Sequence, residues 1–173
     1  MNVRVQRLFA EVLFPTVGLI FWNWGFDFIL WFYFLDQFAG LVSDVVKKNG
    51  GFVLQHHWLI IVELIVILCA IAVFTVDFLG SLMDFLSYED MGIAQGYFLL
   101  PIMILGEYLK INLERKTGVI WQTSKRAQFI KTALFALLLV GVIFEGAALY
   151  AAVAFILILA LINLLFPPIL IKK

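Results

Sequence analysis

The sequence predicts an all-α fold, a polytopic integral membrane bundle of five transmembrane helices. Two observations support this prediction. The chain of 173 residues is 64% hydrophobic and only 14% charged, whereas a soluble domain of this size leaves a large share of its residues facing water. Apolar runs of about 20 residues also recur along the chain, and this length matches the hydrocarbon thickness of a bilayer. We therefore expect a single transmembrane domain over residues 1–173.

The first two spans are expected at about residues 16–42 and 52–86. Pro15 suits the first turn of a helix, where its missing N–H is not needed. Two lysines, an asparagine and two glycines at residues 47–51 then predict a turn between the spans. The third span is expected at about residues 91–109, and a basic loop follows at residues 110–128. Gly92 and Gly96 have the spacing that allows another helix to approach closely.

Residues 129–166 form the longest apolar stretch, and their only charged residues are Lys131 and Glu145. A single helix of this length would reach roughly 57 Å, against about 30 Å of hydrocarbon. We therefore expect two spans, at residues 129–145 and 147–166, joined by a tight hairpin. In the second of them, Ala148 and Ala152 are small residues at a helix-packing spacing. One long tilted helix, which would give four spans in total, is the alternative.

The distribution of basic residues distinguishes these two arrangements. With five spans, ten of the twelve Lys and Arg residues lie on one side of the membrane, and with four spans only eight do. Cytoplasmic loops carry an excess of Lys and Arg. The distribution therefore favours five spans, with the N-terminus outside and the C-terminus on the cytoplasmic side.

Acidic residues lie within the predicted spans: Asp27 and Asp36 in the first, Glu63 and Asp77 in the second, and Glu107 near the end of the third. No Lys or Arg is expected deep in any span. A charge at the bilayer centre costs roughly 3 kcal/mol on insertion scales. Each acid therefore needs a proton, a bound cation or a basic residue from another chain. Asp27 is expected near the middle of its span, and the Tyr33 hydroxyl is expected to donate to Glu63.

Four polar residues of the second span are spaced by multiples of seven: His56, Glu63, Asp77 and Asp84. A heptad step drifts by only about 20° on an α-helix, so they are expected to form one polar stripe. One interpretation is a seam of hydrogen bonds between helices. A second is a path for protons or cations, with the histidine at its mouth. A third is contact with a basic residue of a partner subunit.

Sequence motifs for catalysis or nucleotide binding are not found in the chain, so an enzyme is not the expected class. His56 and His57 are adjacent, and adjacent helical residues point about 100° apart. They do not predict a metal site unless a second copy of the chain completes it. Ten of the eighteen residues at 21–38 are aromatic. A quinone or a pigment would suit such a surface, but the spacing identifies no cofactor.

The expected function is that of a non-catalytic subunit of a larger membrane complex. The chain has almost no mass outside its predicted spans, and its predicted buried acids exceed the basic residues available to them. The alternative is a homo-oligomeric proton or cation channel lined by the second helix. The expected partners are the lipid bilayer, other membrane subunits or further copies of the chain, and anionic lipid at the basic loop. A net charge of zero gives no field that would attract nucleic acid.

Overall fold

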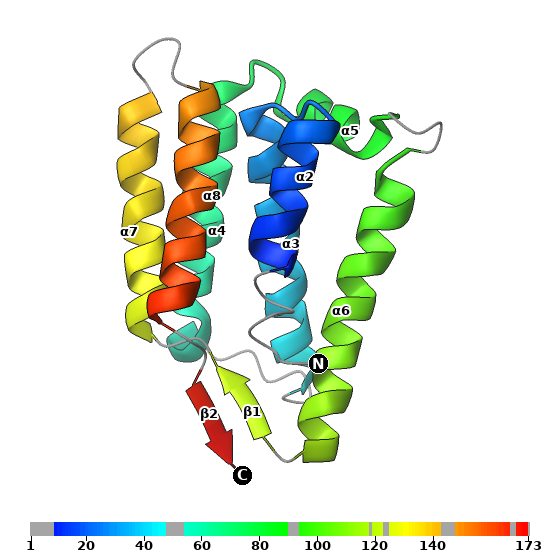
Figure 1. Ribbon diagram of the computed structural model, residues 1–173, viewed down its shortest axis with the longest axis vertical. Helices are drawn as coiled ribbons and strands as arrows, with labels where there is room; N and C mark the ends of the chain where they lie inside the picture. The colour runs from blue at the N-terminus through cyan, green and yellow to red at the C-terminus, as the bar shows by residue number, and fades with distance from the viewer. Residues whose placement is uncertain are drawn as a thin grey trace.

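The computed structural model describes residues 9–47, 54–89, 94–117, 119–122, 125–142, 148–166 and 169–172. Within these residues the chain is helical apart from one short pair of strands, so the all-α class is confirmed (Figure 1). The elements in order are η1 (Phe9–Leu13, a π-helix), α2 (Phe14–Phe21), α3 (Phe26–Lys47), α4 (Leu54–Phe74), α5 (Phe78–Ser87), α6 (Gly96–Thr117), β1 (Val119–Gln122), α7 (Lys125–Val142), α8 (Ala148–Leu165) and β2 (Ile169–Lys172).

The long helices run side by side along the long axis of the molecule, and α3 lies at their centre (Figure 1). It contacts α2, α4, α5, α6 and α8. At one end of the bundle, α5 lies across the helices, and we call this the α5 end. At the other end, α6 finishes with Arg115 and Lys116, and β1 pairs with β2. We call this second end the basic end.

Two helices are long and apolar enough to cross a membrane, judged by length and composition within the described residues: Phe26–Val46 and His57–Phe74. Shorter apolar helices cover Glu11–Phe21, Phe78–Ser87 and Ala152–Leu165. Two long apolar helices are weak support for membrane association, because a core helix of a soluble protein can be equally apolar. The prediction of five membrane crossings goes beyond this observation.

The predicted first span is divided into two helices. A turn at residues 22–25 separates α2 from α3, and α2 packs back against α3 (Figure 1). Asn23 in this turn has a φ of 49°, a left-handed conformation that asparagine tolerates better than most residues. The carbonyl oxygen of Gly18 accepts hydrogen bonds from the backbone N–H groups of Trp22 and Trp24, at 3.1 and 3.0 Å. The single helix expected at residues 16–42 is therefore wrong.

The predicted second span is also interrupted. The helix α4 ends at Phe74, and α5 begins at Phe78 in a different direction (Figure 1). Asp77 caps the start of α5, because its side chain accepts a hydrogen bond from the backbone N–H of Gly80 at 2.9 Å. Aspartate favours this position over a helix interior, since its side chain can bond to free backbone N–H groups. The continuous polar stripe expected on one helix is therefore wrong.

The C-terminal half contains two separate helices, α7 and α8, where a hairpin was expected. They pack against each other, and α7 also packs against α4. The segment expected as a basic loop at residues 110–128 is shorter in the structure, because α6 continues to Thr117 and α7 begins at Lys125. Between them, β1 pairs antiparallel with β2 near the C-terminus. The connection from α6 to α7 and the C-terminal strand therefore lie at the same end of the bundle.

Candidate functional site

Four charged side chains from four elements gather inside the bundle. They are Glu11 of η1, Asp36 of α3, Glu63 of α4 and Lys131 of α7, and we call them the interior charge cluster. Glu11, Glu63 and Lys131 are only 6%, 1% and 5% exposed, and Asp36 is partly exposed. Charged side chains are rarely buried to this extent unless they are paired. The cluster is therefore the strongest candidate for a functional site among the described residues.

A buried ion pair joins two helices of the cluster. The Nζ atom of Lys131 lies 3.2 Å from Oε1 of Glu63. The other carboxylate oxygen of Glu63, Oε2, is buried and accepts no hydrogen bond from the described residues. The sequence predicted no basic residue deep in a span, and it did not indicate that Lys131 is buried. The helix α7 begins at Lys125 and places Lys131 almost two turns inside the helix, in contact with a buried carboxylate. Glu63 thus finds its counterion within the chain.

Glu11 is held by two other helices. Its Oε2 atom accepts a hydrogen bond from Nδ2 of Asn163 on α8, at 2.8 Å. Its backbone carbonyl oxygen accepts a hydrogen bond from the hydroxyl of Tyr33 on α3. The expectation that Tyr33 would donate to Glu63 was therefore wrong. Glu11 was missing from the sequence-based candidates, because it lies in a short segment of mixed polarity before Pro15.

Asp36 lies between the buried cluster and a more exposed ion pair. Its electrostatic neighbours are Glu11, Lys131, Glu107 and Lys110. Of these, Glu107 and Lys110 pair with each other on α6, at 3.3 Å, with side chains 23% and 34% exposed. Asp36 therefore lies within electrostatic range of the buried Glu11 and Lys131 and also of a partly exposed ion pair.

Asp27 lies in the first turn of α3, and the expected position near the middle of a span is wrong. Its Oδ2 atom accepts a hydrogen bond from Oγ of Ser81 at 3.4 Å, and the same Oγ accepts one from Nε1 of Trp31 at 3.0 Å. The start of a helix also carries a partial positive charge that favours a carboxylate. Asp27 therefore joins α3 to α5 as a structural residue.

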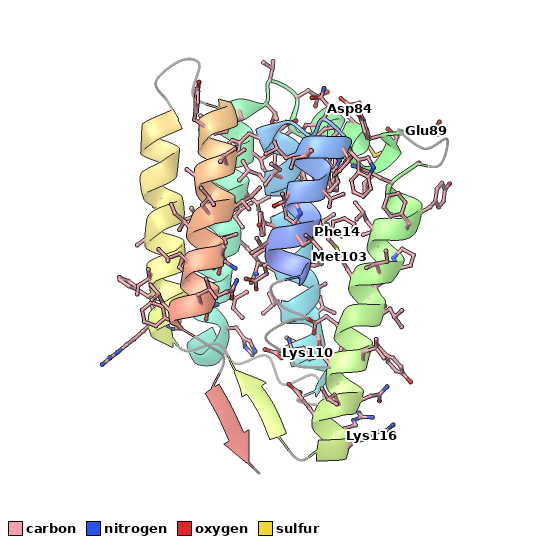
Figure 2. The ribbon with its side chains drawn as sticks, viewed as in Figure 1. Phe14, Asp84, Glu89, Met103, Lys110 and Lys116 are labelled. Atoms are coloured by element: carbon pink, nitrogen blue, oxygen red, sulfur yellow. The ribbon has the colours of Figure 1, made fainter. Side chains whose placement is uncertain are left out.

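The remaining predicted site residues are not brought to the cluster. Asp77 is the cap of α5, and Asp84 is exposed on α5 at the far end of the bundle (Figure 2). His56 belongs to the first turn of α4, but its side chain lies outside the described part of the structure. Within the described residues, no group of three or more His, Cys, Asp or Glu side chains could hold a metal ion.

The four predicted packing residues have different outcomes. A Cβ atom on Gly96 would lie 2.9 Å from the backbone carbonyl oxygen of Leu86, so this glycine does allow α6 to approach the end of α5. Ala152 is fully buried in α8. Gly92 lies outside the described residues, and so does the side chain of Ala148, the first residue of α8.

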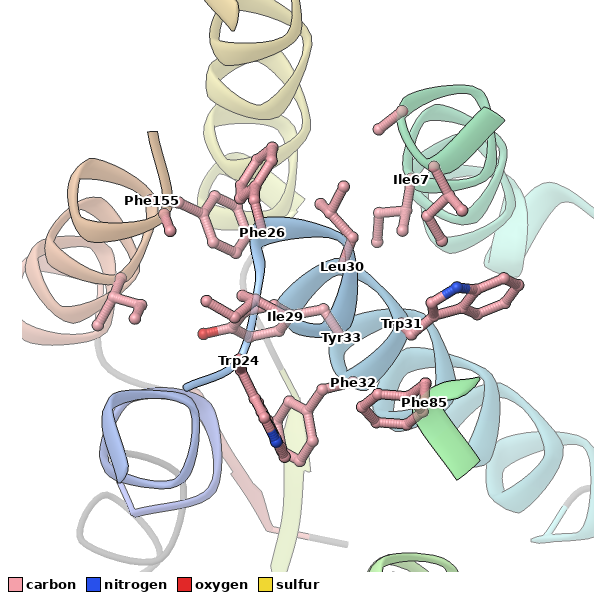
Figure 3. Close-up of a cluster of buried hydrophobic side chains, with 14 of the residues drawn as sticks. Trp24, Phe26, Ile29, Leu30, Trp31, Phe32, Tyr33, Ile67, Phe85 and Phe155 are labelled. Carbon is pink, nitrogen blue, oxygen red and sulfur yellow. The ribbon is translucent and has the colours of Figure 1, made fainter. Parts of the chain in front are cut away.

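An aromatic core fills the bundle between the cluster and the α5 end. Rings from α3 meet rings from α5 and α8, and most of the α3 rings are buried rather than facing outward (Figure 3). The ring contacts include Trp24 with Phe85, at 5.7 Å between centroids, and Tyr33 with Phe155, at 4.8 Å. Trp24 also donates from Nε1 to Oε1 of Gln95 at 3.1 Å. The aromatic residues of α3 and of the turn before it therefore form packing contacts and hydrogen bonds inside the fold.

Comparison of the sequence with protein-family models, with curated proteins and with solved structures finds no match. The buried ion pair of Glu63 with Lys131 joins α4 to α7, and removal of one partner would leave the other as a buried charge.

Proposed function

We propose that this chain is a small multi-pass membrane protein that acts as a non-catalytic subunit of a larger membrane complex. The observation that carries the membrane assignment is the apolar outer surface of the long helices. On α6, side chains more than half exposed include Tyr97, Ile104, Leu105, Tyr108 and Leu109. An apolar face of this kind is unfavourable in water and is what a lipid-facing helix presents.

The five crossings of the proposal are α3, α4, α6, α7 and α8, which alternate in direction along the bundle (Figure 1). Opposite charges at the two ends support this arrangement. Asp84 and Glu89 lie at the α5 end, whereas Lys110 and Lys116 lie toward the basic end (Figure 2). Because Lys and Arg concentrate on the cytoplasmic side, we place the basic end in the cytoplasm and the α5 end outside.

The path of η1 and α2 changes the proposed side of the N-terminus. These elements run opposite to α3 and meet it through the turn at residues 22–25, at the α5 end (Figure 1). The chain therefore enters η1 from the direction of the basic end. The expectation of an N-terminus outside is not supported, and we instead place it on the same side as the C-terminus.

The proposed membership of a complex is supported by the small mass available outside the helices. The described segments that connect the long helices are α5 and the β1 strand, which pairs with β2. Neither offers room for a soluble catalytic domain. The test is native mass spectrometry of the protein extracted from its own membrane in mild detergent, after alkaline carbonate washing. A stoichiometric complex with other chains supports the proposal. A lone chain or a homo-oligomer overturns it.

A second candidate function is proton or cation transport. It is favoured by the burial of a charged pair, Glu63 with Lys131, between two long helices. The lining expected from Asp77 and Asp84 is not part of this candidate, because these residues belong to α5 and its cap, whereas Glu63 lies on α4. The test is proton and cation flux in liposomes that contain the purified chain. Flux that is lost in Glu63→Gln, with assembly intact, supports transport, and equal flux in both proteins excludes Glu63 from any pathway.

A further inference from the structure

The helix α6 is covered by the rest of the chain over only part of its length. Toward the α5 end, Leu99 and Met103 are 1% and 8% exposed. From residue 104 to residue 116, toward the basic end, every residue of α6 is at least partly exposed and none is buried. We call residues 104–116 the uncovered half of α6. Within the described part of the chain, this half has no complete packing partner.

An ion pair lies in the uncovered half, on the side of α6 that faces α3. Met103, Glu107 and Lys110 follow each other at steps of four and three residues, which places them on one face of the helix. Figure 2 shows Met103 and Lys110 on the α3 side of α6. Nζ of Lys110 donates to the two carboxylate oxygens of Glu107, at 3.3 and 3.4 Å. The amine has three N–H donors, so at least one of them is left for a further acceptor.

The depth of this ion pair is unfavourable for contact with lipid. Glu107 is in the middle of α6, with eleven residues of the helix before it and ten after it. Lys110 bonds back toward Glu107, one turn closer to the middle, so its amine is not directed to the basic end. Both side chains are partly exposed, at 23% and 34%. Charged groups that meet lipid tails at this depth are strongly unfavourable, so this side of α6 needs a polar neighbour.

A glycine leaves open space beside the ion pair. Gly106 precedes Lys110 by one turn and lies on the same side of the helix. A Cβ atom on Gly106 would meet no atom of the described residues within 4 Å. Glycine inside a helix is unfavourable relative to alanine, and close packing within the chain does not explain it here. Small residues that let a second backbone approach, next to polar side chains that form hydrogen bonds, are typical of contacts between membrane helices.

We propose that the α3-facing side of the uncovered half of α6 is the surface on which a transmembrane helix of another subunit docks. The backbone of that helix approaches Gly106, and one of its polar side chains accepts a hydrogen bond from Lys110. The outer side of the same half differs, because Ile104, Leu105 and Tyr108 are exposed there and carry no charge, which suits lipid. The inference rests on the proposed function and names the contact through which the chain joins its complex.

The first test compares Gly106→Leu with the native chain by native mass spectrometry of the complex extracted in mild detergent. We expect the assembled fraction to fall about tenfold or more, because the larger side chain blocks the approach of the second helix. Thermal unfolding of the isolated chain should not fall, because the added atoms enter open space and leucine favours a helix more than glycine does. Ile104→Phe is the matched control. It adds bulk about 200° around the same helix, at a position 67% exposed, and should leave assembly unchanged.

A second test identifies the neighbour directly and decides the matter if Gly106→Leu proves unstable. A lysine analogue that carries a photoreactive diazirine replaces Lys110 in the assembled complex, and a leucine analogue with the same group replaces Ile104. On illumination, we expect position 110 to form a covalent adduct with a different chain and position 104 to form one with lipid.

The outcomes separate this inference from the proposed function. In an assembled chain, adducts of position 110 with lipid or with a second copy only, or no adduct at all, overturn the inference and leave membership of a complex standing. Assembly that is unchanged in a stable Gly106→Leu, or lost equally in Ile104→Phe, also overturns it. A native chain that is found alone or as a homo-oligomer overturns the proposed function, and the inference with it.

Discussion

The contact between Lys131 and Glu63 determines how each variant of this pair should behave. Both side chains are almost fully buried, and removal of one partner leaves the other as an uncompensated charge. We expect Lys131→Met to lower the free energy of unfolding by about 3 kcal/mol. Unfolding by denaturant in mixed micelles measures this loss.

The double variant Lys131→Met, Glu63→Met provides the control for this prediction. Replacement of both partners by apolar residues leaves no buried charge, so stability should return close to that of the native chain. Lys110→Met should have little effect, because the pair of Lys110 with Glu107 is partly exposed. Equal stability of Lys131→Met and Lys110→Met would show that the buried ion pair does not form.

Gly18 is the position where a single methyl group should be most harmful. A Cβ atom there would lie 2.2 Å from Cε3 of Trp24, whose indole ring packs across the glycine. The ring is buried and is held by a hydrogen bond to Gln95, so it cannot move aside easily. We expect Gly18→Ala to lower stability by about 1–3 kcal/mol. Gly40→Ala is the matched control, because no heavy atom lies within 4 Å of its added methyl group. Thermal unfolding that ranks the two variants equally would contradict this packing.

At the scale of single residues, the sequence indicated that buried acids exist but not which groups meet them. Glu63 was identified because an acid in an apolar run is conspicuous. Its partner Lys131 was expected at the very start of the fourth span, at about residue 129, whereas α7 begins four residues earlier at Lys125. Glu11 and Asn163 are separated by 152 positions in the chain and are brought together only by packing. Such contacts leave no periodic signal.

At the scale of elements, hydrophobic runs predicted where helices lie but not where they bend. Residues 52–86 are apolar enough for one helix, and yet the chain turns after Phe74. Two residues beside the break favour the end of one helix and the start of the next. Thr75 donates its hydroxyl to the carbonyl oxygen of Ile71 at 2.8 Å, and Asp77 caps the next helix. These side-chain bonds compete with helix continuation. The heptad spacing of His56, Glu63 and Asp77 suggested one face and concealed the break.

The capping role of Asp77 makes a prediction that a transport role does not. Asparagine is as good an N-cap as aspartate, so Asp77→Asn should keep its stability, whereas Asp77→Ala should lose about 1 kcal/mol. Asp84→Ala is the control, because Asp84 lies exposed within α5 and caps nothing. The comparison is made by thermal unfolding. A loss in Asp77→Asn as large as that in Asp77→Ala would show that the charge of Asp77 matters rather than the cap.

At the scale of the whole molecule, the difference in charge between the two ends of the bundle is the feature that supports the proposed orientation in a membrane. The connection from α6 to α7 pairs with the C-terminal strand at the basic end. The fold therefore places these two segments on the same side of the proposed membrane, without any count of charges. The side of the N-terminus could not be derived from hydrophobicity, because a single span was expected where α2 and α3 form two helices. The proposed side of the N-terminus depends on the path of η1 and α2.

The proposed orientation predicts that the N-terminus and the C-terminus share one side of the membrane. The measurement is labelling of single cysteines by an impermeant thiol reagent in sealed vesicles, with Cys69 replaced by alanine and an epitope tag fused ahead of Met1. Lys116→Cys marks the basic end and Ser87→Cys marks the α5 end, since both positions are exposed. We expect the tag and Lys116→Cys to be reached from the same side, and Ser87→Cys from the other. A tag on the side of Ser87→Cys would show that the N-terminal segment crosses the bilayer once more than the path of η1 and α2 indicates.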